Sequence, residues 1–104
     1  MKKQTIILPT AKKILEIVGE NIKLARKRRR WTMENMSERA NISRPTLYFI
    51  EKGSPKVAIG KYLNVVSALK MGNDFLAIAG NDSFGRILQD ADTLNRKHQP
   101  NYLP

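Results

Sequence analysis

Apolar residues recur at three- and four-residue intervals along most of the chain, which is the spacing of an amphipathic helix. The first such stripe predicts a helix over about residues 11–30 and consists of Ile14, Val18, Ile22 and Ala25. Thr10, which follows Pro9, is expected to cap the start of this helix. Gly19 lies inside the helix and is expected to weaken or bend it.

Two short helices joined by a tight turn are predicted next. Thr32 is a suitable N-cap for a helix over about residues 33–40, and Asn41 tolerates the left-handed backbone of a turn. A further helix starts within Ser43-Arg44-Pro45-Thr46, because a first helical turn does not need the N–H that proline lacks. Gly53 is expected to end it. The positions expected to face inwards are Met36, Ala40, Ile42, Leu47 and Ile50.

The second half of the chain carries two more helical stripes. One consists of Ile59, Tyr62, Leu63, Val66 and Leu69, and the other, which predicts a helix over about residues 83–94, of Phe84, Ile87, Leu88 and Ala91. Residues 74–79 between them fit either a short helix or a strand. We therefore expect an all-α fold of five to six short helices. Its expected parts are an N-terminal arm (1–9), a helical domain (10–72), a C-terminal helical extension (73–95) and a flexible tail (96–104).

The composition narrows the class of protein. The 104 residues are enough for one domain, contain no cysteine and carry a formal net charge of +10. No apolar run has the length of a membrane span or of a signal peptide, so a cytoplasmic location is expected. The charge is uneven, because residues 1–56 hold 14 Lys and Arg against 5 Asp and Glu. Such a basic half points to a polyanionic partner, which is DNA, RNA or anionic lipid.

The densest basic run extends from Arg26 to Arg30 and has two interpretations. Cations in the last turn of a helix are stabilising by themselves, because they oppose the helix dipole. Some of these side chains can instead contact phosphate, although only part of the run can face one surface.

The two short helices and their turn have the geometry of a helix-turn-helix. If Leu47 and Ile50 face inwards, the opposite face of the second helix presents two aromatic and two basic side chains. These exposed residues are Arg44, Pro45, Tyr48, Phe49 and Lys52. Such a face fits a DNA major groove, where arginine bonds guanine and aromatic rings contact thymine methyl groups.

The stretch from Trp31 to Gly53 resembles the helix-turn-helix of the Xre/lambdoid-repressor family, most specifically in Ile50-Glu51-Lys52-Gly53. The resemblance covers about residues 14–72 and makes 10–72 a lambda-repressor-like DNA-binding domain. It implies that the second short helix enters the major groove, that the protein binds palindromes as a dimer, and that Arg26 and Glu51 form a buried salt bridge. Met33 stands where the family often has a phosphate-binding glutamine, so the backbone N–H of Met33 is expected to bind the phosphate instead.

A narrower resemblance concerns the partner. Trp31-Thr32 together with Gly85-Arg86-Ile87-Leu88-Gln89-Asp90 is similar to HipB-type antitoxins. This similarity implies a repressor that controls its own operon and binds a HipA-like kinase toxin. The alternative is a stand-alone regulator whose last helix packs on the core or forms a dimer interface.

These observations predict a sequence-specific repressor of double-stranded DNA that is a homodimer and not an enzyme. The residues expected to read bases are Ser43, Arg44, Pro45, Tyr48 and Phe49. Those expected at phosphates are Lys23, Lys27, Arg28, Thr32, Met33, Thr46, Lys52 and Lys56. No cofactor or metal site is expected, because His98 is alone in the tail and Asp90 and Asp92 point to different sides of a helix. The rival functions are a basic protein-interaction module and a membrane-surface role for the first helix.

Overall fold

The computed structural model describes residues 6–96, and within this range it contains helices and no strand. The elements are α1 (Pro9–Arg28), α2 (Met33–Ala40), α3 (Arg44–Glu51), α4 (Ile59–Ala68), the 3₁₀ helix η1 (Gly72–Ala77) and α5 (Ser83–Arg96). The all-α prediction is confirmed, and residues 74–79 belong mostly to a helical turn. His98 and most of the predicted tail and N-terminal arm lie outside the described residues.

Helix α1 starts one residue before the cap that the sequence predicts, so the prediction for Thr10 is wrong. Pro9 occupies the first turn and Leu8 is the N-cap, with no side-chain hydrogen bond. The proline ring already fixes a helical φ and lacks the N–H that a cap would satisfy. At the other end the helix stops at Arg28, and Arg30 adopts the left-handed conformation with φ 56°.

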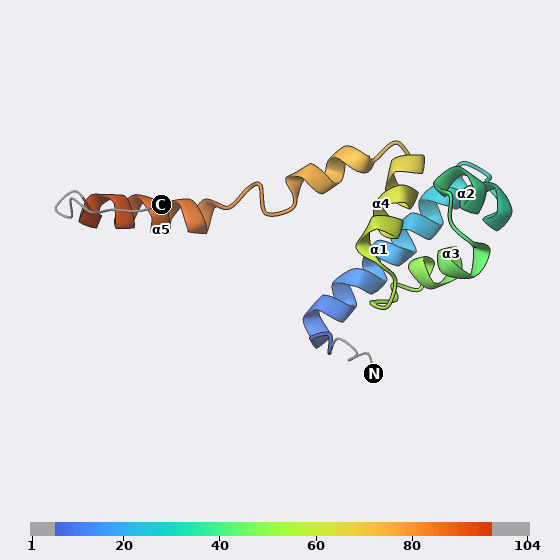
Figure 1. Ribbon diagram of the computed structural model, residues 1–104, viewed down its shortest axis with the longest axis horizontal. Helices are drawn as coiled ribbons and strands as arrows, with labels where there is room; N and C mark the ends of the chain where they lie inside the picture. Colours follow the sequence, from blue (N-terminus) through green and yellow to red (C-terminus); the bar gives the residue numbers. More distant parts are fainter. Residues whose placement is uncertain (1–5, 97–104) are drawn as a thin grey trace.

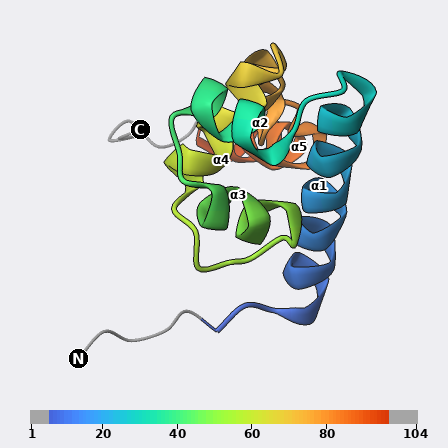
Figure 2. The same ribbon diagram turned by 90° about the vertical axis from the view of Figure 1, so that its right-hand side faces the viewer.

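The glycine inside α1 permits a close approach between helices. The helix continues through Gly19 without interruption. Gly19 is buried, and a Cβ atom there would lie 2.6 Å from the carbonyl oxygen of Ile50 and 2.7 Å from the amide nitrogen of Gly53. The absence of a side chain therefore lets α1 lie directly against the end of α3, as Figure 2 shows.

The core lies among α1, α2, α3 and α4, which form the body of the molecule (Figure 2). The buried hydrophobic residues are Ile22, Ala25, Met36, Ala40, Leu47, Ile50, Tyr62, Val65 and Leu69. Ile42, predicted to face inwards, is partly buried against them. Three positions of the predicted apolar stripes are not buried, because Ile14 is 59%, Ile59 is 72% and Leu63 is 38% exposed. Ile59 is the first residue of α4, and Ile14 lies in the second turn of α1.

Helix α5 lies away from this body. Figure 1 shows it at the end of a linker that follows η1. Its start is capped, because the Asp82 carboxylate accepts a hydrogen bond of 2.9 Å from the amide N–H of Gly85. The predicted apolar stripe is present but uncovered, and Phe84 is 70% exposed. Of the two alternatives for this helix, packing on its own core is therefore not what the structure shows.

Candidate nucleic-acid interface

The exposed face of α3 is set by the burial of its opposite face. Leu47 and Ile50 are completely buried, so residues on the other side of the helix point into solvent. Tyr48 is 52% exposed and Phe49 is 50% exposed. Their rings meet edge to face, with centroids 5.6 Å apart. Large aromatic side chains are rarely left open on a solvated helix unless a partner covers them.

Two basic side chains extend this face at the two ends of α3. Arg44 is exposed in the first turn, and Lys52 is exposed directly after the last. The Lys52 Nζ lies 5.5 Å from the centre of the Tyr48 ring. Lys52 and Tyr48 therefore belong to one exposed surface. Phe49 and Pro45 are also exposed on this side of α3.

The start of α3 is fixed by its own polar side chains. The Ser43 hydroxyl accepts a hydrogen bond of 3.2 Å from the backbone N–H of Thr46 and lies 2.8 Å from the Thr46 hydroxyl. Capping therefore uses part of the hydrogen-bonding capacity of both residues. Both hydroxyl groups remain near the helix N-terminus, where the helix dipole favours an anion.

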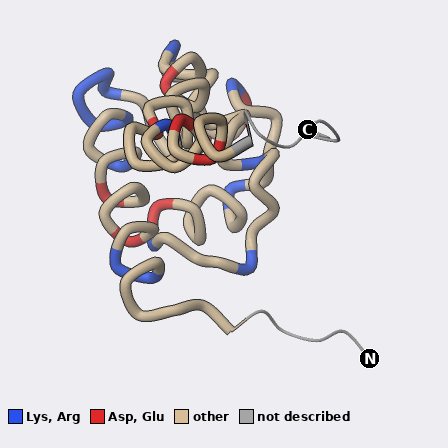
Figure 3. The backbone as a smooth tube through the Cα atoms, turned by 90° about the vertical axis from the view of Figure 1, so that its left-hand side faces the viewer, with Lys and Arg blue, Asp and Glu red and all other residues tan. Residues whose placement is uncertain are grey.

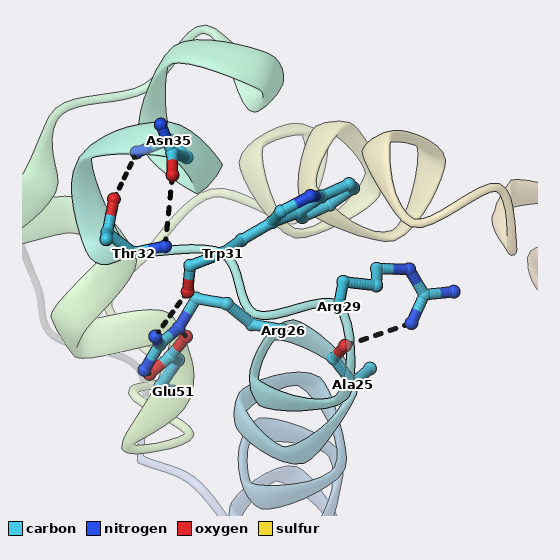
Figure 4. A network of polar contacts seen from close by, with 7 residues as sticks. All are labelled: Ala25, Arg26, Arg29, Trp31, Thr32, Asn35 and Glu51. Carbon is cyan, nitrogen blue, oxygen red and sulfur yellow. Dashed lines mark hydrogen bonds and ion pairs between the residues drawn. The ribbon is translucent and has the colours of Figure 1, made fainter.

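A second capped helix start lies at α2. The backbone N–H of Asn35 donates to the Thr32 hydroxyl at 3.0 Å, and the Asn35 side-chain oxygen accepts from the Thr32 N–H at 3.3 Å (Figure 4). This reciprocal capping box confirms Thr32 as the N-cap. The role of Asn35 was missed from the sequence, although a polar side chain three residues after the cap is its signature.

The pair of Arg26 and Glu51 joins α1 to the end of α3. Arg26 Nε donates to Glu51 at 2.7 Å, and a terminal guanidinium nitrogen donates to the second carboxylate oxygen at 3.2 Å. The remaining terminal nitrogen donates to the Trp31 carbonyl oxygen at 3.0 Å. Both charged side chains are buried (Figure 4). This is the pair implied by the family resemblance. It fixes the C-terminal end of α3 against α1, on the side of α3 opposite its exposed face.

Two arginines of the basic run therefore face the inside of the molecule. Arg29 donates to the carbonyl oxygens of Ala25 at 2.9 Å and Leu69 at 3.1 Å. Its guanidinium also lies 5.7 Å from the centre of the Trp31 ring. Arg39 covers that ring more closely, at 4.2 Å. Trp31 is partly buried against the core, where it packs at the junction of α1 and α2.

The basic residues expected at phosphates are not all on one surface. Lys23 and Lys52 line a single hollow of about 230 Å³ together with Met33 and Tyr48, so α1, α2 and α3 bring them together. Lys56 is exposed in the segment that follows α3, and Lys27 is exposed on α1. Arg28 lines a different groove, beside Val66 of α4. Figure 3 likewise shows basic positions on several sides of the body.

Other chemistry is not indicated within residues 6–96. No cluster of three metal-ligating side chains occurs in this range. In the same range, no helix combines the length and apolar character needed to cross a bilayer.

Burial raises the pKa of the Tyr62 hydroxyl. That hydroxyl donates to the Ser54 carbonyl oxygen at 2.6 Å, where it fixes the loop after α3.

Comparison with known proteins supports the interpretation of this geometry. The model of a helix-turn-helix family matches residues 22–70, which run from the middle of α1 to just past α4. The all-helical architecture is thus a lambda-repressor-like helix-turn-helix fold, in agreement with the prediction. The match spans 49 of the 104 residues and supports a DNA-binding transcriptional regulator. Searches of curated proteins and of solved structures found no match.

Proposed function

We propose that the protein is a sequence-specific repressor that binds a palindromic operator in double-stranded DNA as a homodimer. The observation that carries this proposal is the exposed face of α3. Aromatic and basic side chains cover it, and two capped helix N-termini lie nearby. A helix of this kind presents its N-terminal residues to base edges in a major groove.

The proposed base contacts come from the first two turns of α3. Arg44 is placed to bond guanine, and Tyr48 and Phe49 to contact thymine methyl groups. Ser43 and Pro45 lie at the start of the same face. Because Ser43 also caps the helix, its role in base recognition is expected to be smaller than that of Arg44.

The proposed phosphate contacts surround this helix. Lys23 and Lys52 lie together beside α3, and the N-terminus of α2 offers the backbone N–H of Met33 and the Thr32 cap. Thr46 and Lys56 lie at the two ends of the α3 region. We place Lys27 and Arg28 at the edge of the DNA surface, where they add attraction without fixing position.

The test separates base recognition from phosphate binding. An operator is first selected from a random duplex pool, and affinities for it and for random DNA are measured by fluorescence anisotropy. Arg44→Ala is expected to lose about 1–3 kcal/mol at one base step, and Lys52→Ala to weaken binding to all sequences and reduce the salt slope by about one. Lys61→Ala, an exposed cation on α4, is the matched control.

Two results would contradict the proposal. Equal losses on operator and random DNA would remove Arg44 from base recognition. A selection that yields no preferred sequence would favour a basic protein-interaction module instead, with DNA binding caused by charge alone.

We further propose that the regulator is the antitoxin of a HipA-like kinase and represses their shared operon. The support is the segment Gly85–Asp90, which lies on the exposed helix α5. The tagged chain should be isolated from its native cells at gentle salt and the bound proteins identified by mass spectrometry. A stoichiometric kinase supports the proposal, whereas an empty eluate favours the alternative of a stand-alone regulator.

A further inference from the structure

The apolar face of α5 is not covered by any other part of the described chain. Phe84, Ile87 and Leu94 are spaced three and seven residues apart and are each more than 60% exposed, and Leu88 is 54% exposed. A helix of 14 residues is only marginally stable in water without tertiary contacts. The capped start at Asp82 favours the helix, but the apolar face still requires a covering surface.

The body of the same chain has an apolar groove of suitable kind. Two hollows of about 460 and 420 Å³ lie between α1, α4 and η1, and they share Val18, Phe75 and Ile78 as lining residues. They therefore form one groove, most of whose lining is aliphatic or aromatic. Arg28 and Asp74 are its charged lining residues. This groove is separate from the exposed face of α3.

The charges of the two parts are complementary. Residues 82–96, which are α5 and its capping residue, hold 3 Asp against 2 Arg, a net charge of −1. Residues 6–81, which include the groove, hold 14 Lys and Arg against 5 Glu and 1 Asp, a net charge of +8. On a helix, Asp90 and Asp92 flank the apolar stripe on opposite sides, and Figure 3 shows acidic positions on α5. The basic body therefore attracts this helix.

We propose that the α5 helix of one chain packs into the groove between α1, α4 and η1 of a second copy, and that the exchange is reciprocal. In Figure 1 the helix extends away from its own body, where it is accessible to another chain. A two-fold axis lets each copy donate one helix and receive one. If each large side chain loses on the order of 100 Å² and the groove loses a comparable area, each copy buries roughly 800 Å², as in a standard stable interface.

This inference rests on the homodimer of the proposed function, and it assigns the surface that forms it. The first test is sedimentation of the full chain without DNA, comparing Ile87→Glu with Thr93→Glu. The latter places the same charge on the opposite side of α5 and is the matched control. We expect Ile87→Glu to weaken self-association at least tenfold and Thr93→Glu to change it less than twofold. A monomeric wild-type chain, or equal effects of the two variants, would overturn the proposal.

The second test identifies what occupies the groove. Because the chain has no cysteine, Leu88→Cys in one tagged chain and Asn21→Cys in a differently tagged chain provide single attachment sites for a short bismaleimide. Asn21 is exposed and lines the groove, so its replacement leaves the core intact. We expect crosslinks between the two differently tagged chains.

Other patterns of crosslinking would overturn the exchange. Crosslinks of the Leu88→Cys chain with itself alone would show that α5 pairs with α5. A third variant carries both Leu88→Cys and Asn21→Cys in one chain. If only this variant forms crosslinks, and they lie within a single chain, α5 folds back onto its own body. Both tests omit DNA, so they do not depend on operator binding. A dimer that binds no operator would refute the proposed function alone. A chain that binds an operator but forms no crosslinks would refute this inference alone.

Discussion

Removal of either member of the buried Arg26–Glu51 pair should destabilise the domain severely. Arg26 makes two hydrogen bonds to Glu51, at 2.7 and 3.2 Å, and one to Trp31 at 3.0 Å. Replacing one partner by an apolar residue leaves the other charge buried without compensation, which costs about 3–5 kcal/mol. A body of about 65 residues has a total stability of roughly 3–10 kcal/mol. Arg26→Met or Glu51→Leu therefore leaves the fold close to unfolding.

Urea denaturation is the appropriate assay, and the single tryptophan provides its signal, because Trp31 accepts the third hydrogen bond of Arg26. The double variant Arg26→Met/Glu51→Leu removes both charges, so its loss should be much smaller than the sum of the single losses. Lys27→Met, which removes an exposed neighbouring charge, should change the free energy of unfolding by less than about 0.5 kcal/mol. Single losses below about 1 kcal/mol, or losses that add in the double variant, would refute this reasoning.

Three further substitutions test other parts of the fold. Gly19→Ala should destabilise the domain despite alanine's advantage of about 1 kcal/mol in a helix, because the new Cβ would lie 2.6 Å from the backbone oxygen of Ile50; a higher melting temperature would contradict the close approach. Thr32→Ala should lower stability by about 1 kcal/mol through the capping box, and Thr32→Ser should retain most of it. Because burial raises the pKa of Tyr62, folding keeps its hydroxyl protonated; its contribution is complete below pH 10 and is lost as the pH rises through the folded-state pKa. In pH titrations of urea stability, Tyr62→Phe should lack this alkaline loss, and an identical decline in both proteins would assign it to other groups.

Local signals in the sequence determined the helix-turn-helix accurately. The Thr32 cap, the left-handed Asn41 with φ 55° and the left-handed Gly53 with φ 73° occur where the sequence predicts them, and Ser43 caps the helix start predicted within Ser43-Arg44-Pro45-Thr46. Each of these features depends on hydrogen bonds and backbone preferences within about four residues. The inward positions of α2 and α3 follow as well, because a short helix between fixed turns has one way to bury its apolar side.

The orientation of residues in long helices depended on the tertiary structure. The stripe of α4 included Ile59, which is exposed, and omitted Val65, which is completely buried. Helical spacing allows more than one apolar face, and only the neighbouring helices determine which face is covered. The same reason explains α5, whose apolar stripe is real but lies away from the core of its own chain.

The sequence by itself determined an all-helical basic chain with a capped helix-turn-helix and the face of α3 that is available to DNA. The tertiary structure decided how the basic run is divided, because Arg26 and Arg29 bond groups on distant segments while their neighbours remain exposed. It also decided that Gly19 serves a close helix contact. Capping and turn formation act over a few residues, whereas burial and ion pairing depend on Glu51 and Leu69, which only folding brings beside α1.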